Sequence, residues 1–96
     1  MRRALVERSL KDVHVRLVRA RQELAVLEEQ LGALSEAADE ARIRALVSET
    51  PVAGSDYGDA QRHADAAARA HQALKATIDE LEHRQDELLS RLGDRN

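Results

Sequence analysis

Hydrophobic residues recur at alternating spacings of three and four positions from Leu10 to Ser48. This is the heptad pattern of a helix that packs along a partner helix through its first and fourth positions, a and d. The a positions are Leu10, Leu17, Leu24, Leu31, Ala38 and Ala45, and the d positions are Val13, Ala20, Leu27, Leu34, Ala41 and Ser48. We call these a and d positions the seam. They predict one coiled-coil helix over about residues 3–49.

Gly32 is the one residue within this helix that weakens it. It lies at a b position, off the seam, and the heptad phase continues through it unchanged. A glycine inside a helix costs about 1 kcal/mol relative to alanine without disturbing the register. An uninterrupted helix is therefore favoured, and the alternative is a break near Gly32–Ser35.

A second heptad repeat follows a segment that breaks helices. Pro51 disfavours a helical conformation at the residue before it, and Gly54 tolerates a positive φ, so we expect a turn over about residues 50–56. Ser55 or Asp56 is a suitable N-cap for a second helix over about residues 57–92. Its seam consists of Tyr57, Ala60, Ala64, Ala67, His71, Leu74, Ile78, Leu81, Gln85, Leu88 and Leu92.

Both seams are rich in alanine near the turn and rich in leucine away from it. Folding back at the turn therefore matches small side chains with small and large with large. The register with the best charge pairing sets Leu31 against Leu74 and His71 against Leu34, with Arg21 beside Glu82 and Glu28 beside Lys75. In that register the residues before about Lys11 overhang the second helix.

These patterns predict an all-α fold in which residues 1–96 form a single domain, an antiparallel two-helix coiled-coil hairpin. A hairpin of two helices buries one seam per helix and is marginally stable alone. The first helix carries a further apolar stripe on its b and c positions. Its residues are Leu5, Val18, Ala25, Val26 and Ala33. This stripe favours a homodimer in which two hairpins form a four-helix assembly.

Composition points to a cytoplasmic protein of bacterial type. The chain has no Cys, which fits a reducing compartment, and no apolar run that approaches the roughly 18 residues needed to span a bilayer. Basic residues begin the chain, but no apolar stretch follows them, so we do not expect a signal peptide. The bias toward Ala and Arg is typical of a GC-rich genome and carries no functional information.

The chain has a net charge of −3, and its charged residues are distributed unevenly along the sequence. Residues 1–21 contain seven basic and two acidic side chains, whereas residues 22–59 contain two basic and nine acidic ones. The predicted overhang, with Arg2, Arg3, Arg8 and Lys11, is a candidate contact for nucleic acid, an acidic protein or an anionic membrane. A solvated helix end is the alternative, and the lack of aromatic residues there weighs against base stacking.

No catalytic, cofactor-binding or metal-binding motif is present. The histidines are His14, His63, His71 and His83, and none has another histidine three or four positions away. The carboxylates fall mainly on water-facing helix positions, with no apolar pocket to raise their pKa. We therefore expect a protein that is not an enzyme and that binds no cofactor.

The turn is the strongest candidate site. Three apolar residues of the first helix lie off the seam beside it, close to the one aromatic residue of the chain. The candidate residues are Ile43, Leu46, Val47, Pro51, Val52 and Tyr57. They form either a tip that binds a partner or a surface covered by the turn or by a second copy.

The function most consistent with these features is a non-enzymatic adaptor or scaffold that binds an unidentified protein. Two alternatives remain open at this point. One is a regulator associated with nucleic acid or RNA polymerase, which would use the basic overhang or the acidic residues near the turn. The other is an accessory protein of the membrane surface or of cell division, which would use the basic start of the first helix.

Overall fold

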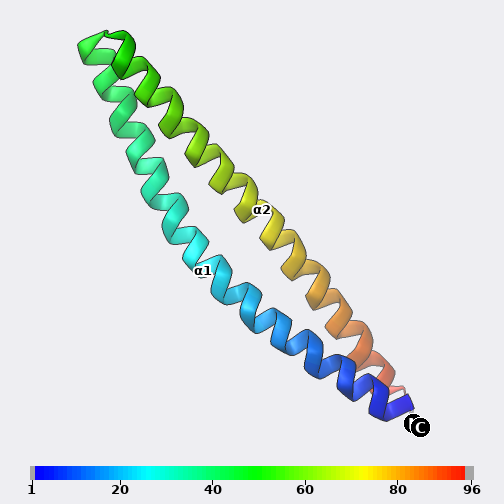
Figure 1. The fold of residues 1–96 in the computed structure, drawn as a ribbon. Helices are drawn as coiled ribbons and strands as arrows, with labels where there is room; N and C mark the ends of the chain where they lie inside the picture. Colours follow the sequence, from blue (N-terminus) through cyan, green and yellow to red (C-terminus); the bar gives the residue numbers. More distant parts are fainter. Residues whose placement is uncertain (1, 95–96) are drawn as a thin grey trace. The chain divides into compact units, whose positions relative to one another are not determined.

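Two long helices account for nearly all of the computed structural model, which describes residues 2–94 (Figure 1). Helix α1 spans Arg2–Ser48 and helix α2 spans Pro51–Gly93, with Glu49 and Thr50 as the link between them. No strand occurs within residues 2–94. The predicted all-α helical hairpin is therefore confirmed at this level, and α1 continues through Gly32 without a break.

Burial follows the heptad pattern closely. Every buried residue in the described part of the chain occupies a predicted a or d position, and none of them is polar or charged. The buried residues are Val13, Leu17, Ala20, Ala38, Ala41, Ala64, Ile78, Leu81 and Leu88. Ser48, which ends the first seam, is exposed. The period of 3.5 residues thus correctly identifies the face of each helix that is turned inward.

The link reverses the chain within two residues. Glu49 has a positive φ of 51°, and its N–H donates to the carbonyl oxygen of Ala45 at 3.1 Å, which closes α1 in the left-handed conformation usual after a helix. Thr50 then caps α2, because its Oγ1 accepts a hydrogen bond from the N–H of Ala53 at 3.2 Å. Pro51 occupies the first helical position, where a missing N–H costs nothing.

The prediction of a turn over 50–56 and a second helix from Tyr57 is therefore wrong. Gly54 does not have a positive φ, and its N–H donates to the carbonyl oxygen of Thr50 at 3.1 Å as part of the first helical turn. Ser55 and Asp56 lie inside α2 and are not its caps. Pro51 starts a helix here because a capping threonine directly precedes it.

The chain divides into two compact units, which are described separately. Unit 1 comprises the chain up to Leu24 and the chain from Leu74 onward, and unit 2 comprises Ala25–Ala73. Whether the chain folds as a single domain stays a prediction.

Unit 1 contains the main hydrophobic core. Leu17 and Leu88 are almost completely excluded from solvent. Around them the core contains Val13, Ala20, Ile78 and Leu81, and Val6, Leu10, Leu24 and Leu74 pack against it. Full burial of a side chain such as leucine contributes about 1.5–3 kcal/mol, so this cluster is the principal source of stability in unit 1.

Unit 2 is built around small side chains. Its buried residues are Ala38, Ala41 and Ala64, while Leu31 and Leu34 are only half-buried. A buried alanine removes one methyl group from water, so each of these positions contributes less than a leucine of unit 1. In this unit the carboxylate Oε1 of Glu28 lies 3.4 Å from Nε2 of His71.

This last contact corrects the predicted register. Glu28 was expected beside Lys75 and His71 opposite Leu34, but Glu28 and His71 contact each other directly. Leu74, expected opposite Leu31, packs against the core of unit 1 as Leu24 does. The physical reason is the short link, which starts α2 six residues earlier than expected, so that Glu28 meets a residue of α2 four positions before the expected Lys75. The expected pair of Arg21 and Glu82 is confirmed, with an N–O distance of 2.9 Å.

Replacing Thr50 with alanine tests the capping arrangement. Thr50→Ala removes the acceptor for the Ala53 N–H and should lower the free energy of unfolding by about 1 kcal/mol. Ser55→Ala is the matched control, because Ser55 lies exposed inside α2 and should change stability by no more than a few tenths of a kcal/mol. Thermal unfolding followed by circular dichroism measures both. A larger loss in Ser55→Ala than in Thr50→Ala would contradict this cap assignment.

Candidate interaction surfaces

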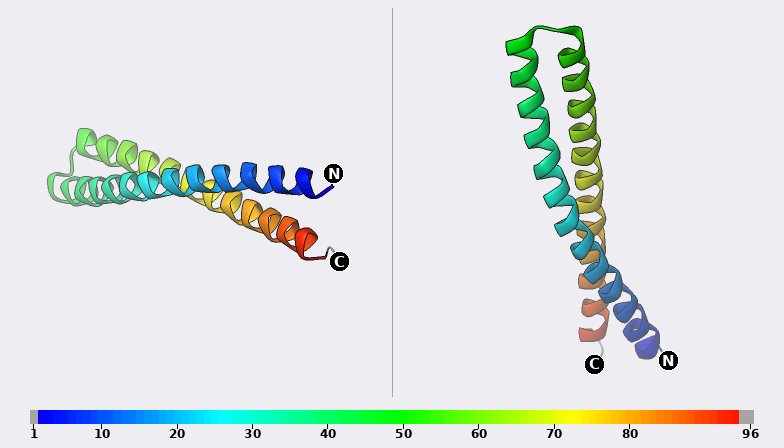
Figure 2. Two further views of the ribbon diagram at one scale, coloured as in Figure 1. Left: turned by 90° about the horizontal axis from the view of Figure 1, so that it is seen from below. Right: turned by 60° about the vertical axis from the view of Figure 1, so that its left-hand side comes forward.

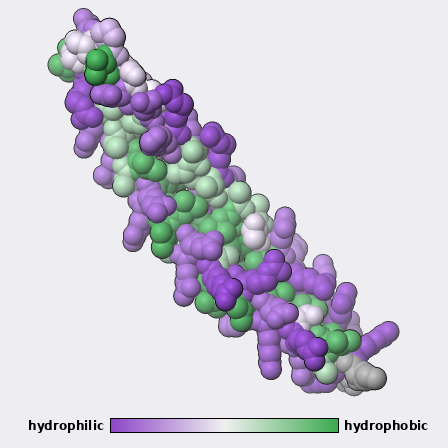
Figure 3. Space-filling view, viewed as in Figure 1, coloured by the Kyte–Doolittle hydropathy of each residue, from purple (hydrophilic) through white to green (hydrophobic). Residues whose placement is uncertain are grey.

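Four large apolar side chains lie exposed in unit 2, where α1 ends and α2 begins. They are Ile43 (55% exposed), Leu46 (65%), Val47 (79%) and Val52 (70%), and we call them the tip patch. Figure 3 shows hydrophobic side chains at the surface of this end of unit 2. They are exposed because the buried Ala41 and the half-buried Ala45 turn the opposite side of α1 inward, and because the two-residue link is too short to fold over them.

A shallow groove of about 410 Å³ runs over part of the tip patch. Ile43, Val47 and Val52 contribute its apolar surface, and Arg44 and Asp56 place opposite charges in its lining. Ser48, Thr50 and Ala53 complete it. Two of these polar groups already have local partners, because the Ser48 hydroxyl donates to the carbonyl oxygen of Arg44 and Thr50 caps α2. The groove is too open to enclose a small molecule.

The other two predicted tip residues differ from each other. Pro51 is exposed at the start of α2, next to Val52. Tyr57 is half-buried at its seam position, so it is less available to a partner. The alternative in which the turn covers the apolar residues is not found within the described chain, where Ile43, Leu46, Val47 and Val52 are exposed. Covering by a second copy or by another protein stays open.

Unit 1 contains a second and more enclosed groove at the start of α1 and the end of α2, with a volume of about 750 Å³. The first turns of α1 and the last turns of α2 diverge there (Figure 2). We call it the end groove. It is lined by Arg2, Arg3, Leu5, Val6, Arg91, Leu92 and Asp94. Leu5 is 59% exposed, whereas Val6 and Leu92 are half-buried.

The predicted basic overhang is wrong in its geometry. Val6 and Leu10 pack against the core of unit 1, and Arg2 and Arg3 share the end groove with residues of α2. The start of α1 has α2 beside it because the register is shifted by the short link. Arg8 and Lys11 are exposed but do not line this groove. A binding role for the four basic residues stays a prediction.

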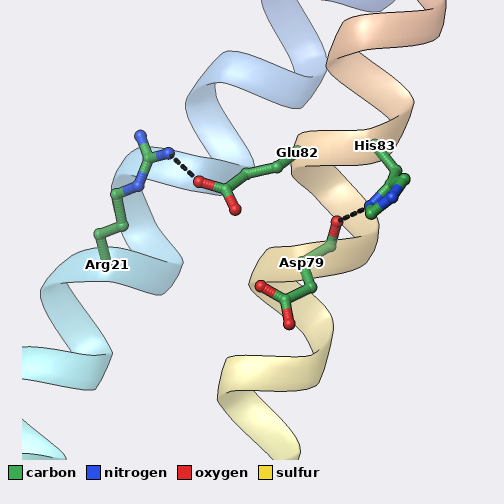
Figure 4. Close-up of polar contacts among 4 residues, drawn as sticks. All are labelled: Arg21, Asp79, Glu82 and His83. Carbon is green, nitrogen blue, oxygen red and sulfur yellow. Dashed lines mark hydrogen bonds and ion pairs between the residues drawn. The ribbon is translucent and has the colours of Figure 1, made fainter.

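Polar contacts within unit 1 are located on its surface (Figure 4). Arg21 of α1 donates to Oε2 of Glu82 of α2 at 2.9 Å, and both side chains are about half exposed. Such a pair contributes about 0.2–1 kcal/mol, which is too little to determine the register. Nearby, Nδ1 of His83 lies 2.9 Å from the carbonyl oxygen of Asp79 one turn earlier.

Within residues 2–94, no group of three or more His, Asp or Glu side chains is placed to hold a metal ion. The described helices also include none that is long and apolar enough to cross a membrane. Comparisons with protein-family models, with curated proteins and with solved structures find no match to this chain.

Sequence reasoning identified the tip patch but missed the end groove. Arg91, Leu92 and Asp94 were assigned to the end of the second helix and its tail, and the incorrect register placed the start of α1 beyond them. A capping threonine directly before proline was the signal that would have corrected the register. With the second helix starting at Pro51, the start of α1 and the end of α2 lie beside each other in unit 1.

His83 provides a test of the electrostatics of unit 1. The hydrogen bond to the Asp79 carbonyl oxygen is the main cause that raises the pKa of His83 above 6.5. Desolvation opposes this rise, and the carboxylates of Asp86, Asp79 and Glu87 each add a smaller effect that raises the pKa. The raised pKa favours the charged ring in the folded state. The contribution of the charged His83 ring to the stability of the folded state is therefore fully present below about pH 6.5. It is lost as the pH rises through the pKa of His83 in the folded state.

An NMR titration of the His83 ring should consequently have a midpoint above 6.5. The double variant Asp86→Asn, Glu87→Gln should lower that midpoint, because it removes two of the attracting carboxylates. A midpoint at or below 6.5 in the unmodified chain, or no change in the variant, would contradict these contacts.

Proposed function

We propose that this protein is a non-enzymatic interaction module, an adaptor or scaffold, that binds a protein partner through the tip patch. The observation that supports this proposal is the exposure of Ile43, Leu46, Val47 and Val52 on adjoining turns of two helices. Apolar residues exposed singly are normal on protein surfaces, but a contiguous group of this kind marks interaction sites.

The composition of the tip suits a protein partner. Burying side chains of this size contributes about 1.5–3 kcal/mol each when solvent is fully excluded, before the cost of association is subtracted. Arg44 and Asp56 lie beside the apolar residues and supply charges of both signs at the rim, which favours one orientation of a partner. Helices α1 and α2 hold the patch in a fixed arrangement, which lowers the entropy lost on binding.

The two alternative functions have less support. A regulator that binds nucleic acid would use the arginines of the end groove, but Arg3 is engaged with Glu7 at 3.1 Å and Asp94 lies in the same lining. An accessory protein of the membrane surface or of cell division would need a larger apolar face around Leu5. Both remain proposals of lower rank than protein binding.

An affinity experiment with tip variants tests the main proposal. Val47→Asp and Val52→Asp each place a charge in the patch, and Ala66→Asp adds the same charge at an exposed position of α2 outside it. The unmodified chain and Ala66→Asp should retain the same bound protein, quantified by mass spectrometry, and both tip variants should lose most of it. Retention by the tip variants, with helical content unchanged by circular dichroism, would refute this use of the tip.

We also propose that the chain is a coiled coil that forms a four-helix homodimer through the outer face of α1. Val18 in unit 1 and Val26 in unit 2 are exposed on this helix, opposite the seam, and Ala25 and Ala33 are exposed as well. A second hairpin packed on these residues would supply the burial that two helices alone lack.

Sedimentation equilibrium measures this assembly. The unmodified chain should sediment with the mass of at least two chains, and the double variant Val18→Glu, Val26→Glu should shift the equilibrium toward one chain, because it buries unpaired carboxylates in the contact. A mass of one chain for the unmodified protein at every concentration would contradict the dimer.

A further inference from the structure

We infer that the tip patch of one copy docks into the end groove of a second copy, so that copies of this protein join head to tail. This inference rests on the proposed function, because it takes the tip as an interaction surface and names its partner. Each surface is described within its own unit, and the two differ in shape and in charge.

The tip is the protruding side of the contact. Val47 and Val52 are the most exposed large apolar residues among the described residues, and they come from the end of α1 and the start of α2. Around them lie the acidic residues Glu49 and Asp56, both exposed, and the basic residue Arg44. Within residues 2–94, no ion pair involves any of these three charged side chains.

The end groove is the receiving side. Its volume is about 750 Å³, and Leu5, Val6 and Leu92 give it an apolar floor. This floor is accessible, because Val6 and Leu92 are only half-buried and Leu5 is exposed. Three arginines and one carboxylate surround it.

The charges of the two surfaces are complementary. Arg2 and Arg91 of the end groove suit Glu49 and Asp56 of the tip, while Asp94 suits Arg44. Opposite charges placed around an apolar centre steer association and select orientation. A docked tip would thus cover apolar residues on both sides and pair charges that have no partner of opposite sign in the described chain.

The geometry of the contact determines the kind of assembly. Because two different surfaces meet, the contact is heterologous: in a joined pair one copy still has a free tip and the other a free groove, so further copies can add until a chain ends or a ring closes. The surfaces are small relative to the roughly 1,200–2,000 Å² that a stable interface buries. Growth should therefore be reversible and should depend on protein concentration.

Sedimentation velocity on the purified full chain tests this inference without any other protein. The tip variant carries Val47→Asp and Val52→Asp, and the groove variant carries Leu5→Asp and Arg91→Glu. Ala66→Asp and Leu89→Asp are the controls, because both positions are exposed and lie outside the two surfaces. The unmodified chain and the controls should increase in mass with concentration beyond two chains, whereas each double variant alone should not.

An equimolar mixture of the two variants gives the decisive result. The tip variant keeps an intact groove and the groove variant keeps an intact tip, so the mixture should be heavier than either variant alone at the same total concentration. A mass that stays constant with concentration in the unmodified chain would overturn the inference. So would a mixture no heavier than its components, or growth that depends on only one of the two surfaces.

A cross-linking experiment avoids new charges and so does not depend on how the charged variants fold. The chain contains no Cys, so single cysteines can be placed freely. A mixture of Val52→Cys and Leu5→Cys chains should be joined by a short bis-maleimide, and a mixture of Val52→Cys and Leu89→Cys chains should not. Equal yields in both mixtures would refute the docking. If both experiments fail while tip variants still lose a captured protein, the proposed function survives without this inference.

Discussion

A chain that ends one helix at Ser48 and begins the next at Pro51 has two residues in which to reverse its direction. Glu49 makes this possible by adopting a positive φ, which costs a residue other than glycine about 1–2 kcal/mol. Thr50 offsets part of this cost by capping α2, and Pro51 supplies a φ that is already helical. The register of unit 2, in which Glu28 meets His71, is consistent with this short reversal.

Apolar burial along the seam then holds the helices together, but unequally in the two units. Unit 1 buries Leu17 and Leu88 together with valine and isoleucine side chains, whereas unit 2 buries three alanines. Alanine allows helix axes to lie close together but contributes little burial. Unit 2 therefore relies more on the half-buried leucines Leu31 and Leu34, and it presents its larger apolar residues to solvent.

Much of this fold could be predicted from the heptads. A strict repeat identifies the inward face of a helix because the position of a residue determines the direction of its side chain on a regular helix. All nine residues that are buried within residues 2–94 lie on that face. The register could not be predicted in the same way. Its charge pairs are worth too little to select it, and shifting one helix by a heptad keeps every seam residue on the seam. The link determines the register, because α2 begins at Pro51, a residue whose type alone equally indicates the end of a helix.

The two candidate surfaces also differ in whether the sequence alone predicts them. The tip patch could be anticipated, because Ile43, Leu46 and Val47 are apolar residues off the seam in a helix whose phase was known. The end groove could not, since it depends on which residues of α1 lie beside Arg91 and Leu92. Both surfaces thus follow from the reversal at Glu49 and Thr50 together with the seam.

Intramolecular cross-linking of paired cysteines in unit 2 tests this reversal most directly. The register set by the two-residue link predicts that the chain with Glu28→Cys and His71→Cys is cross-linked within one molecule by a short reagent. The chain with Leu34→Cys and His71→Cys, which a seven-residue turn would bring together, should react much less. A preference for the second pair would contradict the two-residue link and the register that follows from it.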